Sequence, residues 1–327
     1  MKFVELKKDL EKKIHPAYVI SGNDRYLCYQ AMDMIKNALN INFPDMNLVL
    51  MSGDSVSKDD IARAVNVFPF ADAYRLVQVN DYNGKTKSKL GGDQLLDYLK
   101  QPMQESILVF FNLDGVEALK PYMSYLTHID CDKLDADTIK TVLLSKLSKA
   151  GCSVERDALE TLVMFCNNDM ARISSEVEKL INYVDGREIK KEDVEALVVQ
   201  DKEYQVFQLS EFIARGEKAK ALDLVYTLTG MGGYSGFSIL TPLYNNYRRA
   251  LFCAINKDKS DEEIANSLGV KAYAIKMMKN QIRYYTPKKL KQIVDLLYEA
   301  DRNIKMGKIK EDVAIKTATL NILKIRG

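Results

Sequence analysis

The sequence of 327 residues has no run of about 18 consecutive apolar residues, the length that a transmembrane helix needs. Its opening segment, MKFVELKKDLEKK, is amphipathic and lacks the apolar stretch of a secretory signal peptide. We therefore expect a globular protein of the cytoplasm that contacts no membrane. With 47% hydrophobic residues, a chain of this length can build a large core and more than one domain.

Residues that bind soft metal ions are scarce and scattered. The five cysteines lie far apart and form no CxxC pair, and only His15 and His128 could supplement them as ligands. We therefore expect no metal site and no cofactor. Isolated cysteines in a reducing compartment usually fill small spaces in the core. The cysteines are Cys28, Cys131, Cys152, Cys166 and Cys253.

Motifs that carry catalysis are also absent. The sequence contains no GxSxG and no HExxH, and the two histidines are more than a hundred residues apart, which gives no motif for a triad. Acidic neighbours such as Glu176 with Glu178 are typical of a solvated helix face. We predict no catalytic residue in this chain.

The turn between the first predicted strand and the helix after it lies where nucleotide-binding proteins have a phosphate loop, but the residues of that loop are missing. A Walker A loop needs GxxxxGK[ST], because glycines let backbone amides surround the phosphates and the lysine neutralises their charge. Here SGNDRYLCYQ, residues 21–30, offers one glycine, no lysine and no following Ser or Thr. After the strand at 106–111, an ATPase would have adjacent acidic residues that position magnesium, but this chain has only Asp114. A single aspartate in such a loop is typical of a turn. We predict neither nucleotide binding nor ATP hydrolysis.

Short β-rich runs alternate with helical patterns in the first 115 residues, which predicts an α/β domain with a parallel sheet. Apolar residues at helical spacing in 26–39, 59–67 and 93–101 predict helices that cover the sheet. The predicted strands are residues 17–22, 47–53, 75–79 and 106–111.

Beyond about residue 132 every apolar pattern is helical. We predict an α/β domain over residues 1–135, a small helical domain over 136–203 and a second helical domain over 204–327. Residues 198–208 are interpreted as a linker, and 230–236, GMGGYSG, as a flexible connection between two helices.

Charge is distributed unevenly along the chain. Residues 201–327 hold 22 Lys and Arg against 14 Asp and Glu, whereas residues 1–200 hold 25 against 31. The last third is therefore basic, which suits a nucleic acid or an acidic partner but is also typical of solvated helices.

Several stretches, taken in their order and spacing, resemble one family: the delta subunit of bacterial DNA polymerase III clamp loaders, an AAA+-like protein that has lost its nucleotide site. The resemblance spans nearly the whole chain. It implies an AAA+-like first domain, a small helical lid and a helical collar domain. The stretches are residues 15–35, 68–79, 95–111, 171–198, 206–222 and 262–307.

The resemblance implies a contact with the ring-shaped sliding clamp, made by a short hydrophobic loop of the first domain. The corresponding segment is AVNVFPFADAYR, residues 64–75, in which Phe68 and Phe70 flank Pro69. Members of the family commonly show Leu-Phe or Phe-Phe at the tip, whereas this chain has Pro69-Phe70-Ala71. Phe70 is our first choice of anchor and Phe68 the second. The alternative is that both phenylalanines fill the core between helix and sheet.

The same resemblance implies further partners, namely the motor subunits gamma or tau, the delta-prime subunit and primer-template DNA inside the assembly. Such a chain opens the clamp without hydrolysing ATP, and is classed with DNA-directed DNA polymerase only as a subunit of the holoenzyme. The candidate DNA contacts are Arg248, Arg249, Lys276 and Lys279.

Two other functions remain open at this point. Residues 261–281 are similar to a helix-turn-helix with Gly269 at the turn, which would make the chain a direct DNA-binding protein. An active AAA+ ATPase of a clamp or helicase loader is the other alternative, although it requires the missing phosphate loop. The delta-prime family is disfavoured because its zinc-binding cysteines and SRC motif are absent.

Overall fold

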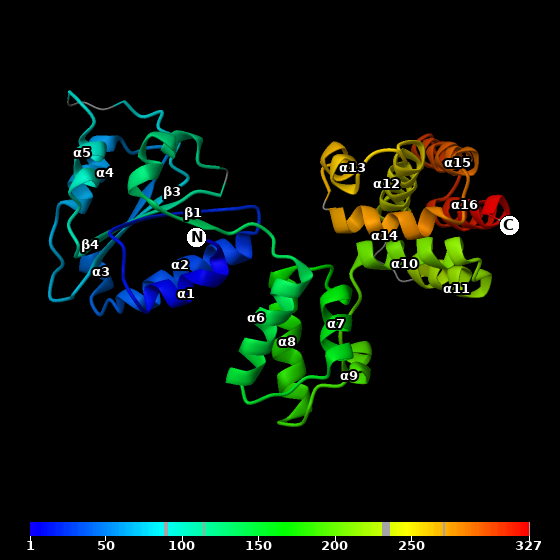
Figure 1. The fold of residues 1–327 in the computed structure, drawn as a ribbon, viewed down its shortest axis with the longest axis horizontal. Helices are drawn as coiled ribbons and strands as arrows, with labels where there is room; N and C mark the ends of the chain where they lie inside the picture. Colours follow the sequence, from blue (N-terminus) through cyan, green and yellow to red (C-terminus); the bar gives the residue numbers. More distant parts are fainter. Residues whose placement is uncertain (88–90, 114, 231–235, 271, 327) are drawn as a thin grey trace. The chain divides into compact units, whose positions relative to one another are not determined.

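The computed structural model describes residues 1–87, 91–113, 115–230, 236–270 and 272–326. The chain forms two compact units (Figure 1). The first comprises Met1–Val154 and Asn168–Glu188, and the second comprises Glu155–Asn167 and Ile189–Gly327. The predicted division into 1–135, 136–203 and 204–327 stays a prediction.

A five-stranded, fully parallel sheet lies at the centre of the first unit, with the strand order β2-β3-β4-β1-β5. The four strands predicted from sequence are confirmed. The fifth, β5, was not predicted, because THID is short and only Ile129 in it is a buried apolar residue. The strands are β1 Ala17–Ser21, β2 Leu48–Ser52, β3 Arg75–Asn80, β4 Ser106–Phe111 and β5 Thr127–Asp130.

Helices cover both faces of the sheet because the chain changes direction across it. It passes from β1 to the edge strand β2 and then returns through β3 to β4, and right-handed crossovers in opposite directions place their helices on opposite faces. The helices are α1 Phe3–Leu10, α2 Arg25–Leu39, α3 Pro44–Asn47, α4 Lys58–Val65 and α5 Gln94–Lys100, with a 3-10 helix, η1, over Glu117–Tyr125. Apolar side chains of α4, α5 and η1 pack with those of the strands in one core cluster.

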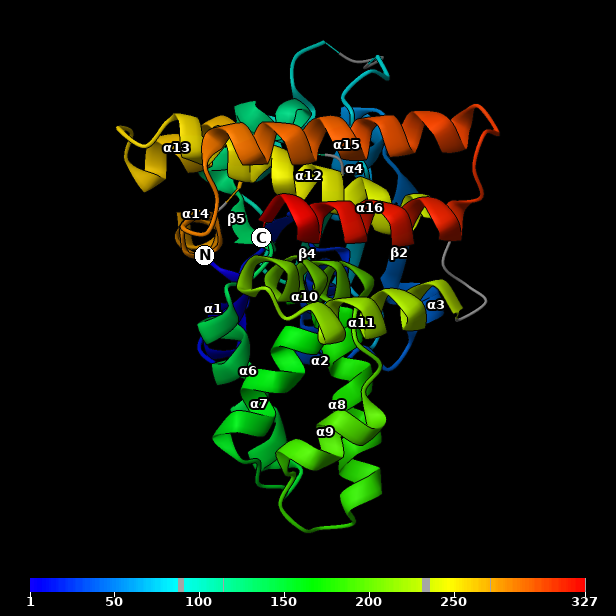
Figure 2. The ribbon, with the colours of Figure 1, turned by 90° about the vertical axis from the view of Figure 1, so that its right-hand side faces the viewer.

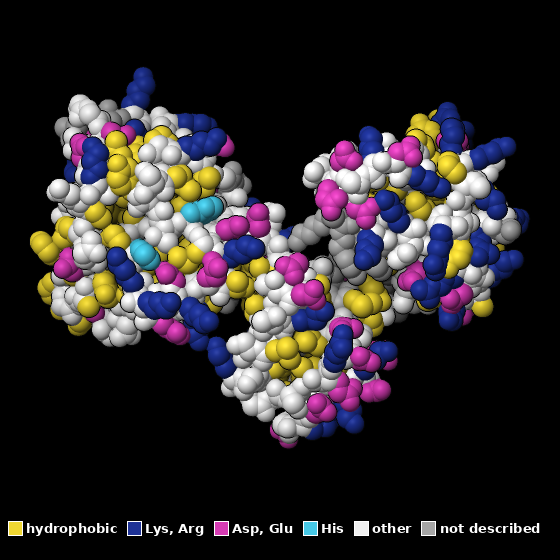
Figure 3. All heavy atoms as spheres, viewed as in Figure 1, with side chains coloured by type: hydrophobic (Ala, Val, Ile, Leu, Met, Phe, Trp, Pro, Cys, Tyr) yellow, Lys and Arg dark blue, Asp and Glu magenta, His cyan; other side chains and the backbone are white. Residues whose placement is uncertain are grey.

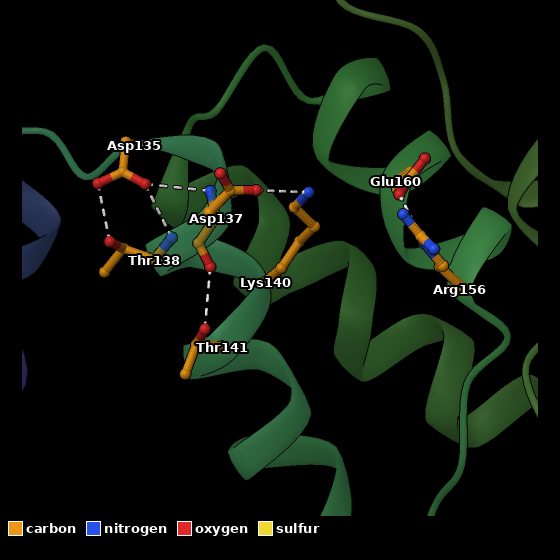
Figure 4. A network of polar contacts seen from close by, with 7 residues as sticks. All are labelled: Asp135, Asp137, Thr138, Lys140, Thr141, Arg156 and Glu160. Atoms are coloured by element: carbon orange, nitrogen blue, oxygen red, sulfur yellow. Dashed lines mark hydrogen bonds and ion pairs between the residues drawn. The ribbon is translucent and has the colours of Figure 1, made fainter.

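Two further helices, α6 (Ala136–Lys149) and α8 (Met170–Val184), complete the first unit. Lys146 of α6 binds α8 through Ser174 Oγ at 2.7 Å and Glu178 Oε1 at 3.0 Å. Asp135 caps α6 by accepting hydrogen bonds from the start of the helix, as Figure 4 shows. Ala136, where the second domain is predicted to begin, is the first residue of α6, and the boundary itself stays a prediction.

Helices alone form the described part of the second unit. The helices beyond residue 201 share a core that includes Leu209, Ile239, Ile293 and Ile322, and Figure 2 shows α12, α15 and α16 side by side. The helices are α7 Arg156–Phe165, α9 Lys191–Leu197, α10 Lys202–Arg215, α11 Lys218–Gly230, α12 Gly236–Ile255, α13 Asp261–Leu268, α14 Ala272–Ile282, α15 Pro287–Lys305 and α16 Glu311–Arg326.

The predicted fold class, an α/β region followed by helices, is confirmed, but the predicted linker over residues 198–208 is wrong. Only 198–201 lie between helices, since α10 begins at Lys202. Val206 is buried in the core of the second unit, which explains why these residues are helical. The predicted flexible connection at 230–236 falls largely on residues 231–235, which lie outside the described residues.

Candidate functional site

The loop between α4 and β3 presents two aromatic side chains to solvent. Phe68 is 73% exposed and Phe70 is 56% exposed, while Pro69 between them is half-buried. Neither phenylalanine fills the core between helix and sheet. Figure 3 shows hydrophobic side chains at the surface of the first unit on the side where α3 lies.

Asn47, the last residue of α3, holds the backbone of this loop. Its side-chain Oδ1 accepts a hydrogen bond from the Phe70 N–H at 2.7 Å, and its Nδ2 donates to the Phe70 carbonyl at 2.8 Å. Asn47 is fully buried, so this carboxamide is fixed and acts on Phe70 as a neighbouring strand would. The position of Phe70 is therefore set by a residue 23 positions away.

Asp72 connects the loop to the segment before α3. Its carboxylate accepts hydrogen bonds from the N–H of Asn42 (3.1 Å), the N–H of Phe43 (3.0 Å) and Nδ2 of Asn47 (2.7 Å). Partial desolvation would raise the pKa of Asp72, but the hydrogen bonds from Phe43, Asn42 and Asn47 outweigh it and lower the pKa to about 2. The carboxylate is therefore charged at every physiological pH.

Two further features show how tightly the loop is held. The ring of Phe70 meets that of Phe43 edge to face, with 6.3 Å between centroids and an angle of 81° between planes. Ala71 has a φ of 53°, a left-handed conformation that a residue with a Cβ rarely adopts. The hydrogen bonds of its neighbours Phe70 and Asp72 to Asn47 stabilise this strained residue.

The helix that leads into the loop, α4, is anchored at its first residue. Lys58 Nζ lies 2.6 Å from Asp93 Oδ2, which also accepts a hydrogen bond from the Tyr122 hydroxyl at 2.8 Å. The Asp93 carboxylate and the Tyr122 hydroxyl raise the pKa of Lys58 above its ordinary value. Burial raises the pKa of Tyr122 to about 12, so that it remains a donor. This cluster joins α4, α5 and η1.

The turn that follows β1 has the place of a phosphate loop, but protein groups fill it. Asp24 caps α2 by accepting a hydrogen bond from the Leu27 N–H at 3.2 Å, and its own N–H donates to the Cys131 carbonyl at 3.1 Å. The Asn23 N–H donates to the Asp132 carboxylate at 2.9 Å. A Cβ added to Gly22 would overlap the carbonyl carbon of Cys131. Backbone and carboxylates thus occupy the start of α2.

Asn112, the residue that follows β4, has a structural role. The Asn112 side chain accepts a hydrogen bond from the Tyr82 N–H at 3.1 Å and donates to the Tyr82 carbonyl at 3.0 Å. Asn112 therefore joins the ends of β3 and β4. Asp114, the lone acid that follows β4 in the sequence, lies outside the described residues.

The candidate DNA contacts lie on two helices of the second unit. Arg248 and Arg249 belong to α12, with Arg248 exposed and Arg249 half-buried. Lys276 and Lys279 belong to α14, where Lys276 is exposed and Lys279 forms an ion pair with Asp261 of α13. Because its charge is already paired, Lys279 is the weakest of the four as a phosphate contact.

The helix-turn-helix that the sequence suggests is formed by α13 and α14. Gly269 ends α13 in the left-handed conformation, with a φ of 63°. In α14, Ile275, Met278 and Ile282 are buried in the core of the second unit. The described part of the second helix thus packs with its neighbours, which favours a structural role.

Metal-binding clusters and membrane-spanning helices are both missing from the part of the chain that the structure describes. No group of three or more His, Cys, Asp or Glu that could hold a metal ion occurs among the described residues. Within the same residues, no helix is both long enough and apolar enough to span a membrane. All five cysteines are buried, as predicted.

Sequence reasoning found the exposed phenylalanines but missed the residues that hold them. Phe43, Asn47 and Asp72 form no recognisable motif, and nothing in their spacing connects them. The one available signal was the segment NFPDMN before β2, in which an aromatic residue and an asparagine flank a proline turn.

Comparison with known proteins assigns the chain to a class. The family model "DNA polymerase III, delta subunit" matches residues 18–126, and the model "DNA polymerase III delta subunit, C-terminal domain" matches residues 203–322. These matches place the chain among the subunits of bacterial DNA polymerase III. It belongs to the delta-subunit family.

Individual relatives agree along nearly the full length. The DNA polymerase III subunit delta of Bacillus subtilis is 25% identical over 97% of this chain and 96% of its own. A probable DNA polymerase III subunit delta of Aquifex aeolicus is 22% identical over 87% of this chain and 84% of its own. The solved structure of a Bacillus subtilis DNA clamp loader delta protein has the same fold, with a TM-score of 0.73 and 22% identity over 98% of this chain and 99% of that one.

Proposed function

We propose that this chain is the delta subunit of a clamp loader, which binds the ring-shaped sliding clamp (beta), opens it, and does not itself hydrolyse ATP. The observation that carries the proposal is the pair of exposed phenylalanines, Phe68 and Phe70, on a loop whose backbone is held in place. A globular domain gains nothing in stability from two aromatic rings in water, so their exposure favours a binding role.

The loop has the properties of a binding hot spot. Rigid aromatic side chains that enter an apolar pocket commonly contribute about 2 kcal/mol or more. Hydrogen bonds from Asn47 fix the backbone of Phe70 before any partner arrives, so less conformational entropy is lost on binding. Pro69 restricts the backbone between the two rings.

The turn after β1 supports the absence of ATP hydrolysis. A nucleotide phosphate at the start of α2 would meet the carboxylates of Asp24 and Asp132, which repel it. Gly22 leaves no space there, because it packs directly on the backbone of Cys131. The chemistry of the loading cycle therefore belongs to the neighbouring subunits.

In this proposal the chain works by binding alone. ATP held by the gamma or tau motor subunits favours an assembly in which the loop reaches the clamp. The ring opens because the loop binds the spread interface more tightly than the closed one. Hydrolysis in the neighbours, triggered by DNA, then withdraws that preference and releases the clamp.

The helical part of the chain has the assembly role. We assign residues 136–203 to a lid domain and residues 204–327 to a collar that contacts the motor and delta-prime subunits. Primer-template DNA would lie inside the assembly, in the cytoplasm, and Arg248 and Lys276 are the exposed candidates for its phosphates.

Release of the clamp from circular DNA tests the proposal. The ring cannot leave a closed circle unless one interface opens, so the purified chain is expected to release it in the absence of ATP. The variant Phe68→Ala with Phe70→Ala is expected to lose this activity, and Tyr183→Ala, an equally exposed aromatic on α8, to keep it. A native chain that releases no clamp, or a double variant that releases it normally, would overturn the proposal.

A further inference from the structure

Phe43 and Phe70 form an aromatic pair at the surface, although they lie 27 positions apart in sequence. Phe43 is 48% exposed and Phe70 is 56% exposed, and the two rings meet edge to face. Each ring therefore restricts the other and still presents a free surface. Met46, which lies in α3 three positions after Phe43, is also exposed.

The backbones that carry the two rings are connected through two polar side chains, the charged Asp72 and the buried Asn47. Asp72 Oδ2 accepts hydrogen bonds from the Phe43 N–H at 3.0 Å and from Asn47 Nδ2 at 2.7 Å. Asn47 in turn makes both hydrogen bonds to the backbone of Phe70. The path from Phe43 to Phe70 thus consists of short hydrogen bonds between charged or buried groups, which makes the pair one rigid unit.

Phe68 behaves differently. It is 73% exposed, and among the described residues its ring has no aromatic partner. Phe70 is fixed in position, whereas Phe68 is free to adjust its rotamer to a partner. The two phenylalanines of the loop are therefore not equivalent, and the fixed one is paired with Phe43, the residue that precedes α3.

We propose that the clamp-binding element is a composite of the loop and the start of α3. Phe43, the residue before α3, and Phe70 enter the same apolar region of the clamp, and Asn47 is a positioning residue for Phe70. This inference rests on the proposed function, because the partner is the clamp ring. Asn47 does not touch the partner. It acts by holding Phe70 against Phe43, so its effect on binding depends on the presence of the Phe70 ring.

Calorimetric titration of the clamp with single and double variants tests this dependence. Phe43→Ala is expected to weaken binding at least about fivefold, which corresponds to about 1 kcal/mol. Asn47→Ala is expected to weaken binding about tenfold in the native background and less than about twofold in the Phe70→Ala background. Tyr183→Ala, the matched exposed aromatic, is expected to leave affinity unchanged.

A merely structural role for Asn47 predicts a different pattern. In that case Asn47→Ala would weaken binding by the same factor with and without the Phe70 ring, and this result would overturn the positioning role. If Asn47→Ala does not fold, as judged by its thermal melt, Asp72→Asn replaces it. That variant keeps the shape of the side chain but replaces one carboxylate oxygen by an NH2 group, and the same dependence on Phe70 is expected.

The outcomes separate this inference from the function on which it rests. Tight native binding that depends on Phe70 but is unchanged by Phe43→Ala and by Asn47→Ala would overturn the composite element and leave the proposed function standing. Binding that does not change in Phe70→Ala would also overturn the composite element alone. A native chain that does not bind the clamp would overturn both.

Discussion

Replacing Asp93 tests whether a single carboxylate holds α4, the helix that leads into the exposed loop. This carboxylate accepts hydrogen bonds from Lys58 Nζ (2.6 Å), the Tyr122 hydroxyl (2.8 Å) and the Leu96 N–H (3.1 Å). Three variants separate these contributions: Asp93→Ala removes all of them, Asp93→Asn removes the charge and keeps the cap of α5, and Lys58→Met removes the ion pair alone.

The structure gives the order of the losses. Removing the helix cap costs about 1 kcal/mol, and leaving the Tyr122 hydroxyl without its acceptor costs about 1 kcal/mol more. The ion pair contributes about 0.5–1 kcal/mol, because its side chains are 34% and 27% exposed and solvent screens them. We therefore expect a loss in the free energy of unfolding of about 3 kcal/mol for Asp93→Ala and about 1 kcal/mol for Lys58→Met. Asp93→Asn is expected to lose about 2 kcal/mol, because the amide oxygen that caps α5 is not available to Lys58 and Tyr122.

The same cluster predicts a pH dependence with a definite sign. Burial would raise the pKa of Asp93, but the hydrogen bonds from Lys58, Tyr122 and Leu96 outweigh it and hold the pKa below its ordinary value. The stabilisation is therefore present above the unfolded pKa of about 3.9 and is lost as the pH falls through the folded pKa. The pKa of Lys58 is raised, so its contribution is complete below about pH 10 and is lost only at higher pH.

Hydrogen exchange of the α4 and α5 amides measures these losses locally, at urea concentrations too low to unfold the chain. The difference between the native chain and Lys58→Met is expected to be constant from neutral pH to about pH 5 and to shrink below about pH 4. Equal protection in all three variants, or a loss in Asp93→Ala no greater than in Asp93→Asn, would refute the reasoning.

Three other predictions follow from the remaining contacts. Gly22→Ala is expected to destabilise the first unit by about 3 kcal/mol in a denaturant titration, because its Cβ would overlap the Cys131 backbone; a stability unchanged from native would contradict this packing. Addition of Mg-ATP to the isolated chain is expected to produce no binding heat and no shift in melting temperature, whereas saturable binding would contradict the blocked phosphate loop. In the assembled loader, the double variant Arg248→Glu, Lys276→Glu is expected to bind primer-template DNA more weakly. The slope of log K against log salt concentration is expected to fall by the equivalent of about 1–2 phosphate contacts. An unchanged slope would remove both residues from the DNA interface.

Much of the fold could be predicted from the sequence, because its strands and helices have strong local patterns. The apolar runs that became β1, β3 and β4 are buried over most of their length, and in the edge strand β2 Val49 and Met51 are half-buried against the core. The helices between the strands carry an apolar face. β5 was not predicted because four residues with one buried apolar side chain give no alternating pattern. The start of α10 was taken for a linker because KEYQVFQ is mostly polar, and its helix depends on the burial of Val206 in a core that the local sequence does not reveal.

The candidate site was predicted only in part for a related reason. Phe68 and Phe70 are neighbours in sequence, so their common loop could be predicted from one segment. Asn47 and Phe43 reach the same loop from more than twenty residues away, and that proximity exists only after β2 and β3 have paired. Side-chain hydrogen bonds to a distant backbone have no periodicity, and so no pattern in one sequence indicates them.

Calorimetric binding of the purified chain to the sliding clamp of its own organism tests the central claim most directly. Phe68 is 73% exposed and Phe70 is 56% exposed, so the complete burial of both side chains contributes at most about 6 kcal/mol to binding. If the clamp contact is made through them, the affinity for the clamp must fall measurably when both are removed. The account predicts that the native chain binds and that the folded Phe68→Ala, Phe70→Ala variant binds at least about tenfold more weakly, a loss of about 1.4 kcal/mol. Absence of binding by the native chain, with both proteins folded, would contradict it.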